Sequence, residues 1–209
     1  LKTEKTAQLD IGFEQQHGAW NTWASAYAGL INDFILVRYN APNASQMYPL
    51  ANNVDATIAG AEAGVGYQFN EHLQADLSAM YAWGENTTDN KPLPQIAPLE
   101  GRLNLRYVQE KYSLGLLWRA VAEQNRISLN DGNIVGYDMG KSKAFSTLAM
   151  NATYKYSEAL DFSVGIDNLL DKAYSEHLNK SGAALFGYAA NEQFNNIGRN
   201  YWARVSMKF

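Results

Sequence analysis

The chain has 209 residues, 46% of them hydrophobic, no cysteine and a formal net charge of −4 at pH 7. Without a basic patch it is not expected to bind nucleic acid, and without cysteine it has neither a disulfide framework nor a thiolate metal site. No apolar stretch approaches the roughly 18 to 20 residues of a membrane-spanning helix, but a transmembrane barrel places its apolar band on alternate residues and keeps mean hydropathy low, here −0.35.

Alternating apolar and polar side chains predict strands through the first half of the chain. Residues 7–13 form the first strand, and residues 20–39 form a second in which small and apolar residues on both faces blur the alternation. Residues 58–70 and 72–84 alternate clearly and are joined through "NEH". Such a short joint predicts an antiparallel hairpin.

The second half of the chain repeats this pattern. Residues 99–107 turn through "QEK" into residues 112–122, and residues 148–156 turn through "SEA" into residues 160–167. A last alternating segment runs from residue 201 to Phe209, which brings the prediction to about nine strands. The apolar face of these strands is expected to meet lipid, and its representatives are Leu77, Leu105, Leu116 and Val164.

The connections alternate between short and long. Tight turns lie near Gln16, Glu71, Glu110 and Glu158, and long polar segments occupy about 39–52, 85–97, 125–142 and 176–198. Short turns at one end, long loops at the other and aromatic residues near both ends of the apolar face are typical of outer-membrane barrels. These features favour an all-β, antiparallel transmembrane β-barrel over a water-soluble β-sandwich, in which the same alternation would mark an internal core.

Two motifs lie close to the C-terminal end. The segment "VGIDNLLDKAYSEHLN" carries the run Asn168, Leu169, Leu170, Asp171, Lys172 and Tyr174. The segment "GRNYWARVSMKF" begins with Gly198 and Arg199 and alternates to Phe209. Both resemble the C-terminal end of TonB-dependent outer-membrane receptors, and the opening "LKTEKTAQLDIGFE" is similar to the beginning of a late strand of the same receptors.

This resemblance implies that residues 1–209 are the C-terminal part of the receptor's barrel domain, about nine strands of a 22-stranded barrel without its plug domain. Because "LKTEKTAQLD" is not a signal peptide, either a signal peptide has been removed or the chain is a fragment, and the fragment is favoured. The resemblance implies the bacterial cell outer membrane and its lipid, and coupling to TonB through the missing N-terminal part with its TonB box. It also implies recognition by the barrel-assembly machinery of a terminal strand ending in Phe209.

The loop "SEHLN" and the residues that follow it most resemble copper receptors, which implies active uptake of a metal, copper. A ferric-siderophore receptor of the same family and a passive porin-like channel are the alternatives. Copper favours thioether and imidazole ligands, and Met47, Met139 and His177 fall in long connections, so they are the candidate metal site. No cofactor is expected besides the transported copper ion. No serine, histidine or glycine-rich pattern has a catalytic context, so no enzyme is expected.

Overall fold

The computed structural model describes residues 1–39, 49–179 and 192–208, and it is an all-β structure built on one antiparallel sheet. No helix in this part of the chain is long and apolar enough to cross a membrane. The strands are β1 (Lys5–His17), β2 (Trp20–Arg38), β3 (Leu50–Gln68), β4 (Leu73–Asn86), β5 (Lys91–Pro92), β6 (Glu100–Val108), β7 (Tyr112–Val121), β8 (Asp131–Gly132), β9 (Phe145–Ser157), β10 (Leu160–Asp167) and β11 (Asn200–Met207).

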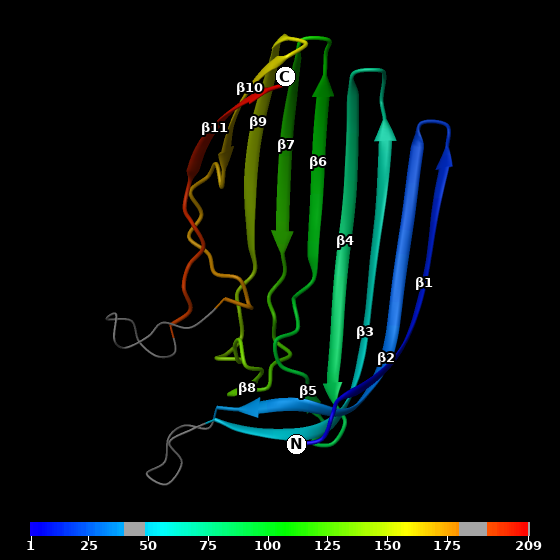
Figure 1. The fold of residues 1–209 in the computed structure, drawn as a ribbon, viewed down its shortest axis with the longest axis vertical. Helices are drawn as coiled ribbons and strands as arrows, with labels where there is room; N and C mark the ends of the chain where they lie inside the picture. The colour runs from blue at the N-terminus through cyan, green and yellow to red at the C-terminus, as the bar shows by residue number, and fades with distance from the viewer. Residues whose placement is uncertain (40–48, 180–191, 209) are drawn as a thin grey trace.

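The long strands follow one another through the sheet in the order β1-β2-β3-β4-β6-β7-β9-β10-β11, so the prediction of nine main strands is confirmed. The two-residue strands β5 and β8 pair with β4 and β2 inside the long connections and carry no alternation that would have predicted them. All four tight turns lie at one end of the sheet, and the long connections lie at the other (Figure 1). This is the predicted asymmetry.

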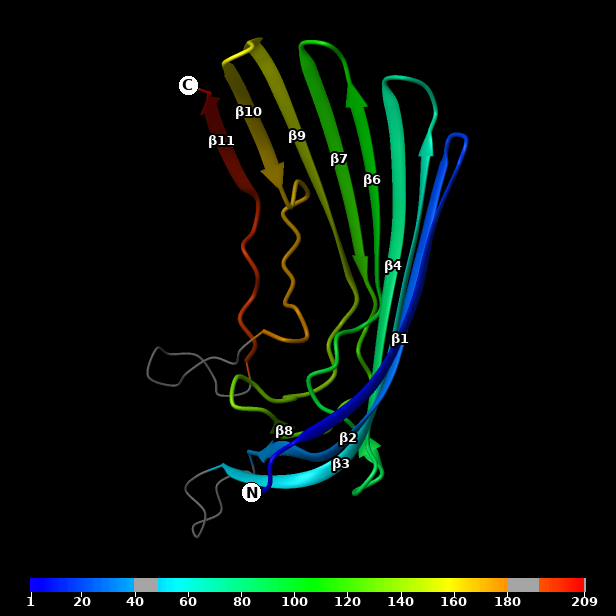
Figure 2. The ribbon, with the colours of Figure 1, turned by 45° about the vertical axis from the view of Figure 1, so that its right-hand side comes forward.

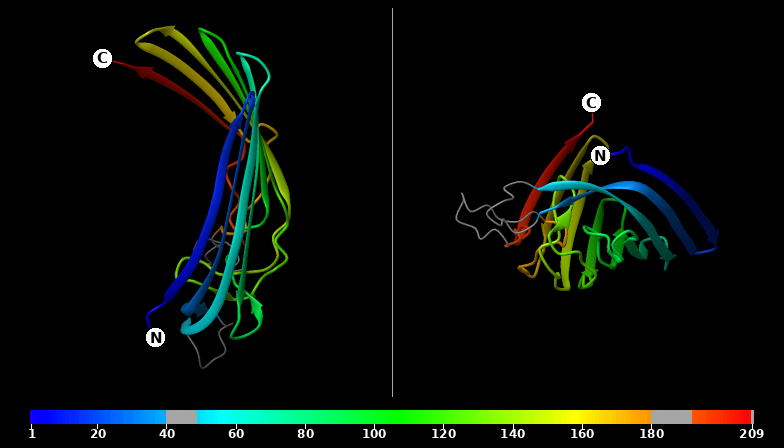
Figure 3. Two further views of the ribbon diagram at one scale, coloured as in Figure 1. Left: turned by 90° about the vertical axis from the view of Figure 1, so that its right-hand side faces the viewer. Right: turned by 90° about the horizontal axis from the view of Figure 1, so that it is seen from below.

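The sheet is a curved wall that is not closed, because β1 pairs only with β2 and β11 only with β10 (Figure 2). Seen along the strands, it forms an arc, and the long connections fold onto its concave side (Figure 3). Closure of such a wall into a barrel would leave no free strand edge. The concave side is therefore the lumen side of the barrel.

The apolar face predicted for lipid is the convex face. Leu105, Leu116 and Val164 line one shallow apolar hollow there, and Leu77 is 49% exposed. The small core of the described residues, formed by Ile31, Ala56 and Leu93, lies on the opposite face, where the connection 87–99 packs against the sheet. The predicted lipid-facing residues do not form an internal core, which agrees with the barrel and contradicts the sandwich.

A bulge in β2 redirects the end of that strand. Between Ile31 and Phe34 the register with β3 shifts, so that Asn32 and Asp33 together oppose Asp55, and Asp33 adopts φ 58°. Beyond this point β2 and β3 bend across the end of the sheet that carries the long connections (Figure 1). The extra residue also exchanges the two faces of β2, which explains why its alternation is blurred in the sequence.

Large aromatic side chains cover glycines of the neighbouring strand on the concave face. Trp23 lies over Gly64, and a methyl group added at Gly64 would come within 2.5 Å of the indole ring. We expect Gly64→Ala to lower the free energy of unfolding by about 1–3 kcal/mol because the ring would have to leave its site. Chemical denaturation in detergent, followed by tryptophan fluorescence, measures this.

Gly101→Ala is the matched control for Gly64→Ala, since an added methyl group there would meet only the Ser78 carbonyl oxygen, at 3.8 Å. It should leave stability unchanged or slightly raised. Equal losses for the two variants would contradict the role assigned to Trp23.

Candidate functional site

Three connections, 87–99, 122–144 and the described parts 168–179 and 192–199 of the third, meet on the concave side at the end opposite the tight turns (Figure 2). The connection 122–144 leaves β7 and crosses to the bent end of β2, where Asp131 pairs with Arg38 and Gly132 pairs with Val37 through β8. It then returns to β9. The crossing places this segment over the lumen end of the wall, where the other two connections contact it.

Asp138 joins all three connections. Its Oδ1 atom accepts hydrogen bonds from the backbone N–H of Gln95 (2.9 Å) and from Gln95 Nε2 (3.1 Å), and its Oδ2 atom accepts one from the backbone N–H of Ser128 (2.9 Å). His177 Nε2 of the third connection lies 3.3 Å from Asp138 Oδ1. We call Asp138 with Gln95, Ser128 and His177 the Asp138 hub.

The Asp138 hub is buried, with Asp138 1% and His177 3% exposed. Burial alone would raise the pKa of the Asp138 carboxyl, but the contact with His177 and the hydrogen bonds from Gln95 and Ser128 outweigh it and lower that pKa below its ordinary value. Both ring nitrogens of His177 are buried without a hydrogen-bond partner among the described residues; Nε2 still has the 3.3 Å contact with Asp138, whereas Nδ1 has none. That ring nitrogen is therefore available to a further ligand.

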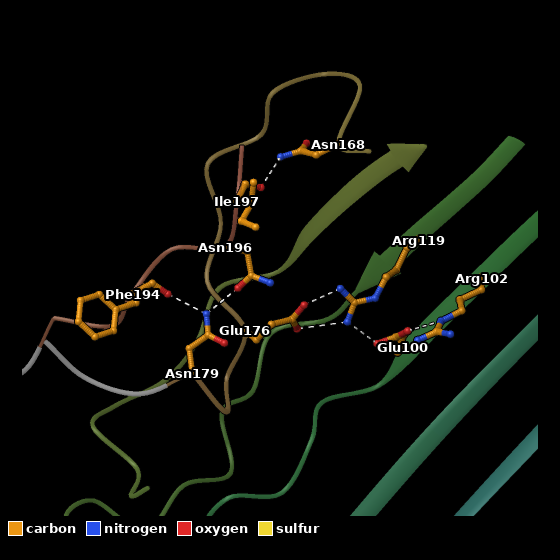
Figure 4. Close-up of polar contacts among 9 residues, drawn as sticks. All are labelled: Glu100, Arg102, Arg119, Asn168, Glu176, Asn179, Phe194, Asn196 and Ile197. Atoms are coloured by element: carbon orange, nitrogen blue, oxygen red, sulfur yellow. Dashed lines mark hydrogen bonds and ion pairs between the residues drawn. The ribbon is translucent and has the colours of Figure 1, made fainter. Parts of the chain in front are cut away.

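A second set of contacts, formed by ion pairs, fixes the third connection to the wall through Glu176. Arg119 on β7 donates from Nη2 to Glu100 Oε2 (2.6 Å) and from Nη1 to Glu176 Oε1 (2.6 Å), and Arg102 Nε donates to Glu100 Oε1 (2.5 Å) (Figure 4). Glu100 is only 7% exposed. Glu100 thus pairs with two arginines of the wall, and Arg119 also pairs with Glu176 of the third connection.

The two arms of the third connection are also tied to each other. Asn179 Nδ2 donates to the Phe194 carbonyl oxygen (2.7 Å) and to Asn196 Oδ1 (2.6 Å), as Figure 4 shows. Glu176 and His177 are consecutive residues, so one short segment contacts both the wall and the Asp138 hub. The three connections thus form one cross-linked cover.

The predicted metal-site residues fall partly within this cover. His177 belongs to the Asp138 hub, Met139 directly follows Asp138 in the chain, and Met47 lies outside the described residues. Across the described ranges, no group of three or more His, Asp or Glu side chains is arranged to hold a metal ion. Sequence reasoning missed Asp138, because an aspartate within "GYDMGKS" carries no signal of its distant partners.

Comparison with known proteins identifies the family to which this architecture belongs. Residues 1–169 match the family model of the TonB dependent receptor-like β-barrel. The chain belongs to the TonB-dependent receptor family. Members of this family are outer-membrane proteins that work with TonB, so the convex face of the wall belongs to a barrel of the bacterial outer membrane. The resemblance inferred from the two C-terminal motifs is thereby confirmed.

Several solved TonB-dependent receptors resemble the chain over its whole length. The structure described as copper transporter OprC is 45% identical, with a TM-score of 0.95, and the match covers 100% of this chain and 32% of that one. The FrpB iron transporter from Neisseria meningitidis (19% identity, TM-score 0.72, 31% covered) and the siderophore receptor PirA from Acinetobacter baumannii (19%, 0.72, 32% covered) share the fold. The chain thus spans about a third of their length. No curated protein matches it.

Proposed function

We propose that this chain is part of a TonB-dependent receptor that takes up copper across the outer membrane. The observation that carries the proposal is the 45% identity to the copper transporter OprC over 100% of this chain. The iron and siderophore receptors that share the fold are only 19% identical, which supports copper over the ferric-siderophore alternative. In the proposed receptor, TonB acts through an N-terminal part, the barrel-assembly machinery reads the strand that leads to Phe209, and lipid covers the convex face.

The cover over the lumen disfavours a passive porin-like channel. Its three connections are joined by the Asp138 hub and by the Arg119 contacts, and they lie across the concave side (Figure 2). A pore that conducts steadily needs an open path, whereas a receptor that releases its cargo on demand is compatible with a covered lumen. Steady conductance of the intact receptor in planar bilayers would support the channel instead.

We further propose that His177 and Met139, together with Met47, lie on the path of the copper ion. Support comes from the soft imidazole and thioether groups, and from the buried Nδ1 atom of His177 that lacks a hydrogen-bond partner among the described residues. Copper is the transported ion in this proposal, and these side chains bind it transiently. No resident cofactor is proposed.

Copper uptake by cells that depend on the intact receptor tests the function. We expect accumulation of isotope-labelled copper that stops when TonB is absent, and no growth benefit from ferric siderophores. His177→Ala combined with Met139→Ala should reduce copper uptake roughly tenfold, a common result of losing groups at a metal site. The control pair is His17→Ala, at the end of β1 beside a tight turn, with Met150→Ala, on the convex face.

Two outcomes separate these claims. Siderophore-dependent iron uptake without copper uptake would refute the copper assignment. Normal copper uptake by the His177 and Met139 double variant would remove these two side chains from the path and leave the receptor's cargo unchanged.

A further inference from the structure

An apolar hollow of about 480 Å³ lies on the convex face of the wall, across the strands β1 to β4. Its lining includes Ile11, Phe13, Ala61, Ala63, Tyr81 and Leu99. Tyr81 stands on the same face of β4 as Leu77, and the side chains of Ile11 and Phe13 are 74% and 61% exposed. The hollow therefore opens toward the lipid around the barrel, and we call it the β1–β4 hollow.

A second pocket, of about 220 Å³, adjoins the β1–β4 hollow, and Tyr81 and Leu99 line both. Its lining also includes Trp83, Glu123, Asn125 and Arg126. Trp83 and Glu85 follow Tyr81 on the convex face of β4. Arg126 lies on this side as well, since its guanidinium carbon is 4.9 Å from the centre of the Trp83 ring and its Nη2 atom is 2.6 Å from Glu85 Oε2. We call it the rim pocket.

Aromatic side chains at the two ends of the convex face indicate its level in the membrane. Trp20 and Tyr67 pack at the tight-turn end with their ring centres 4.4 Å apart, and Trp83 lies toward the long connections. In outer-membrane barrels such aromatic girdles flank the apolar band, and the long connections are extracellular. The β1–β4 hollow therefore belongs to the apolar band, and the rim pocket lies at the level of the outer-leaflet headgroups.

The rim pocket is polar without being basic. Arg126 is already paired with Glu85, and Glu123 forms no ion pair within the described part of the chain. Asn125 Nδ2 donates to Glu123 Oε1 (2.5 Å), which leaves the other carboxylate oxygen able to accept further hydrogen bonds. A phosphate group would be repelled by this carboxylate, whereas the hydroxyl groups of a sugar can donate to it. A sugar ring can also lie against the aromatic ring of Trp83.

We propose that the β1–β4 hollow and the rim pocket together bind one glycolipid of the outer leaflet, with an acyl chain in the hollow and an uncharged sugar headgroup in the rim pocket. Any acyl chain can enter an apolar hollow, so the continuity through Tyr81 and Leu99 carries the proposal. The rim pocket is preformed, because the backbone N–H of Arg126 donates to Gln124 Oε1 (3.0 Å) and its Nη2 donates to the Gly84 carbonyl oxygen (3.3 Å). The proposal does not depend on the transported cargo.

Lipid binding to the intact receptor tests the proposal, with native mass spectrometry as the readout and a detergent that has no sugar headgroup. The probe is monoglucosyl diacylglycerol, and it should bind about tenfold more tightly than phosphatidylglycerol with the same acyl chains. Glu123→Ala should remove this preference, since a hydrogen bond to a charged group contributes about tenfold in affinity. Glu110→Ala, in a tight turn, is its control and should change binding less than about twofold.

The β1–β4 hollow is tested separately by filling it. Ala61→Trp should weaken binding of the glucosyl lipid about tenfold, because displacing two CH₂ groups of the chain has roughly this effect. Ala152→Trp is the control, since Ala152 lines the hollow around Leu105, which shares no lining residue with the rim pocket.

Three outcomes would overturn the proposal. Equal binding of the two lipids would remove the sugar from it, and equal losses for Ala61→Trp and Ala152→Trp would show that the chain has no preferred hollow. Methyl glucoside, a soluble sugar, should compete only weakly. Competition by methyl glucoside at concentrations similar to the lipid would show that the rim pocket binds a soluble sugar without the acyl chain.

Discussion

Replacing Arg119 by Met is expected to destabilise the receptor by about 3–5 kcal/mol, the usual cost of removing one partner of a buried ion pair. Glu100 is only 7% exposed, and Arg119 supplies one of its two ion pairs, so its carboxylate would lose a major source of compensation. The same change frees Glu176 and with it the third connection. Denaturation in detergent measures the first effect, and faster amide hydrogen exchange around Glu176 measures the second.

Arg204→Met provides the matched control, because Arg204 lies on the concave side of β11 and forms no ion pair with any described residue. Its effect should stay within about 0.5 kcal/mol. Adding Glu100→Gln to Arg119→Met should recover part of the lost stability, since the buried charge that has lost one of its two ion pairs is then removed. A double variant that is less stable than Arg119→Met alone would contradict the explanation by charge burial.

Replacing Asp138 by Asn is expected to loosen all three connections together. The amide keeps the size of the side chain, but it loses the charge that favours its contact with His177. Its NH₂ group is a donor, so it cannot replace the carboxylate oxygen that accepts from Gln95 or the one that accepts from Ser128. We expect a loss of about 1–3 kcal/mol in the local stability of the cover, the cost of leaving buried donors unpaired. Hydrogen exchange in residues 92–98, 124–144 and 172–179 should rise together.

The Asp138 hub also predicts a pH dependence. Because the pKa of the Asp138 carboxyl is lower in the folded protein than its ordinary value of 3.8, its stabilisation is fully present above that value. It is lost as the pH falls through the lowered folded pKa. Hydrogen exchange of the cover, compared between wild type and Asp138→Asn, should therefore differ at neutral pH and converge in strong acid.

Asp161→Asn is the control for the Asp138 prediction, since Asp161 lies on β10 beside a tight turn and forms no ion pair in the described residues. It should leave the exchange of the cover unchanged at every pH. A constant difference between wild type and Asp138→Asn down to strong acid would show that the charge of Asp138 does not stabilise the cover.

Much of the wall follows from the sequence because a half-buried strand repeats its pattern every two residues. The strands and tight turns from β3 to β10 follow this rule, although β3 begins at Leu50, eight residues before the predicted segment. In β2 the rule fails at a specific place, the bulge at Asn32 and Asp33, after which the faces exchange. A local insertion of one residue has no compositional signal strong enough to locate it.

The candidate site was predictable only in part. Chemistry identified His177 and Met139 as soft groups in long connections, and the structure places His177 against Asp138, the residue that precedes Met139 in the chain. Asp138 itself, and the pairing of Glu176 with Arg119, depend on three connections meeting far from their own strands. Such contacts join residues that are dozens of positions apart, and no local pattern records them.

The pairing of β8 with the bent end of β2 also bears on the geometry of the barrel. The connection that contains β8 starts at β7 and ends at β9, so it joins these strands directly to β2, which lies several strands away along the arc. It is a chord across the arc (Figure 3). Because this connection has a fixed length, it fixes the distance between β2 and the pair β7 and β9, and therefore the curvature of the sheet between them. The curvature of this part of the barrel is thus held by the connection itself, independently of barrel closure.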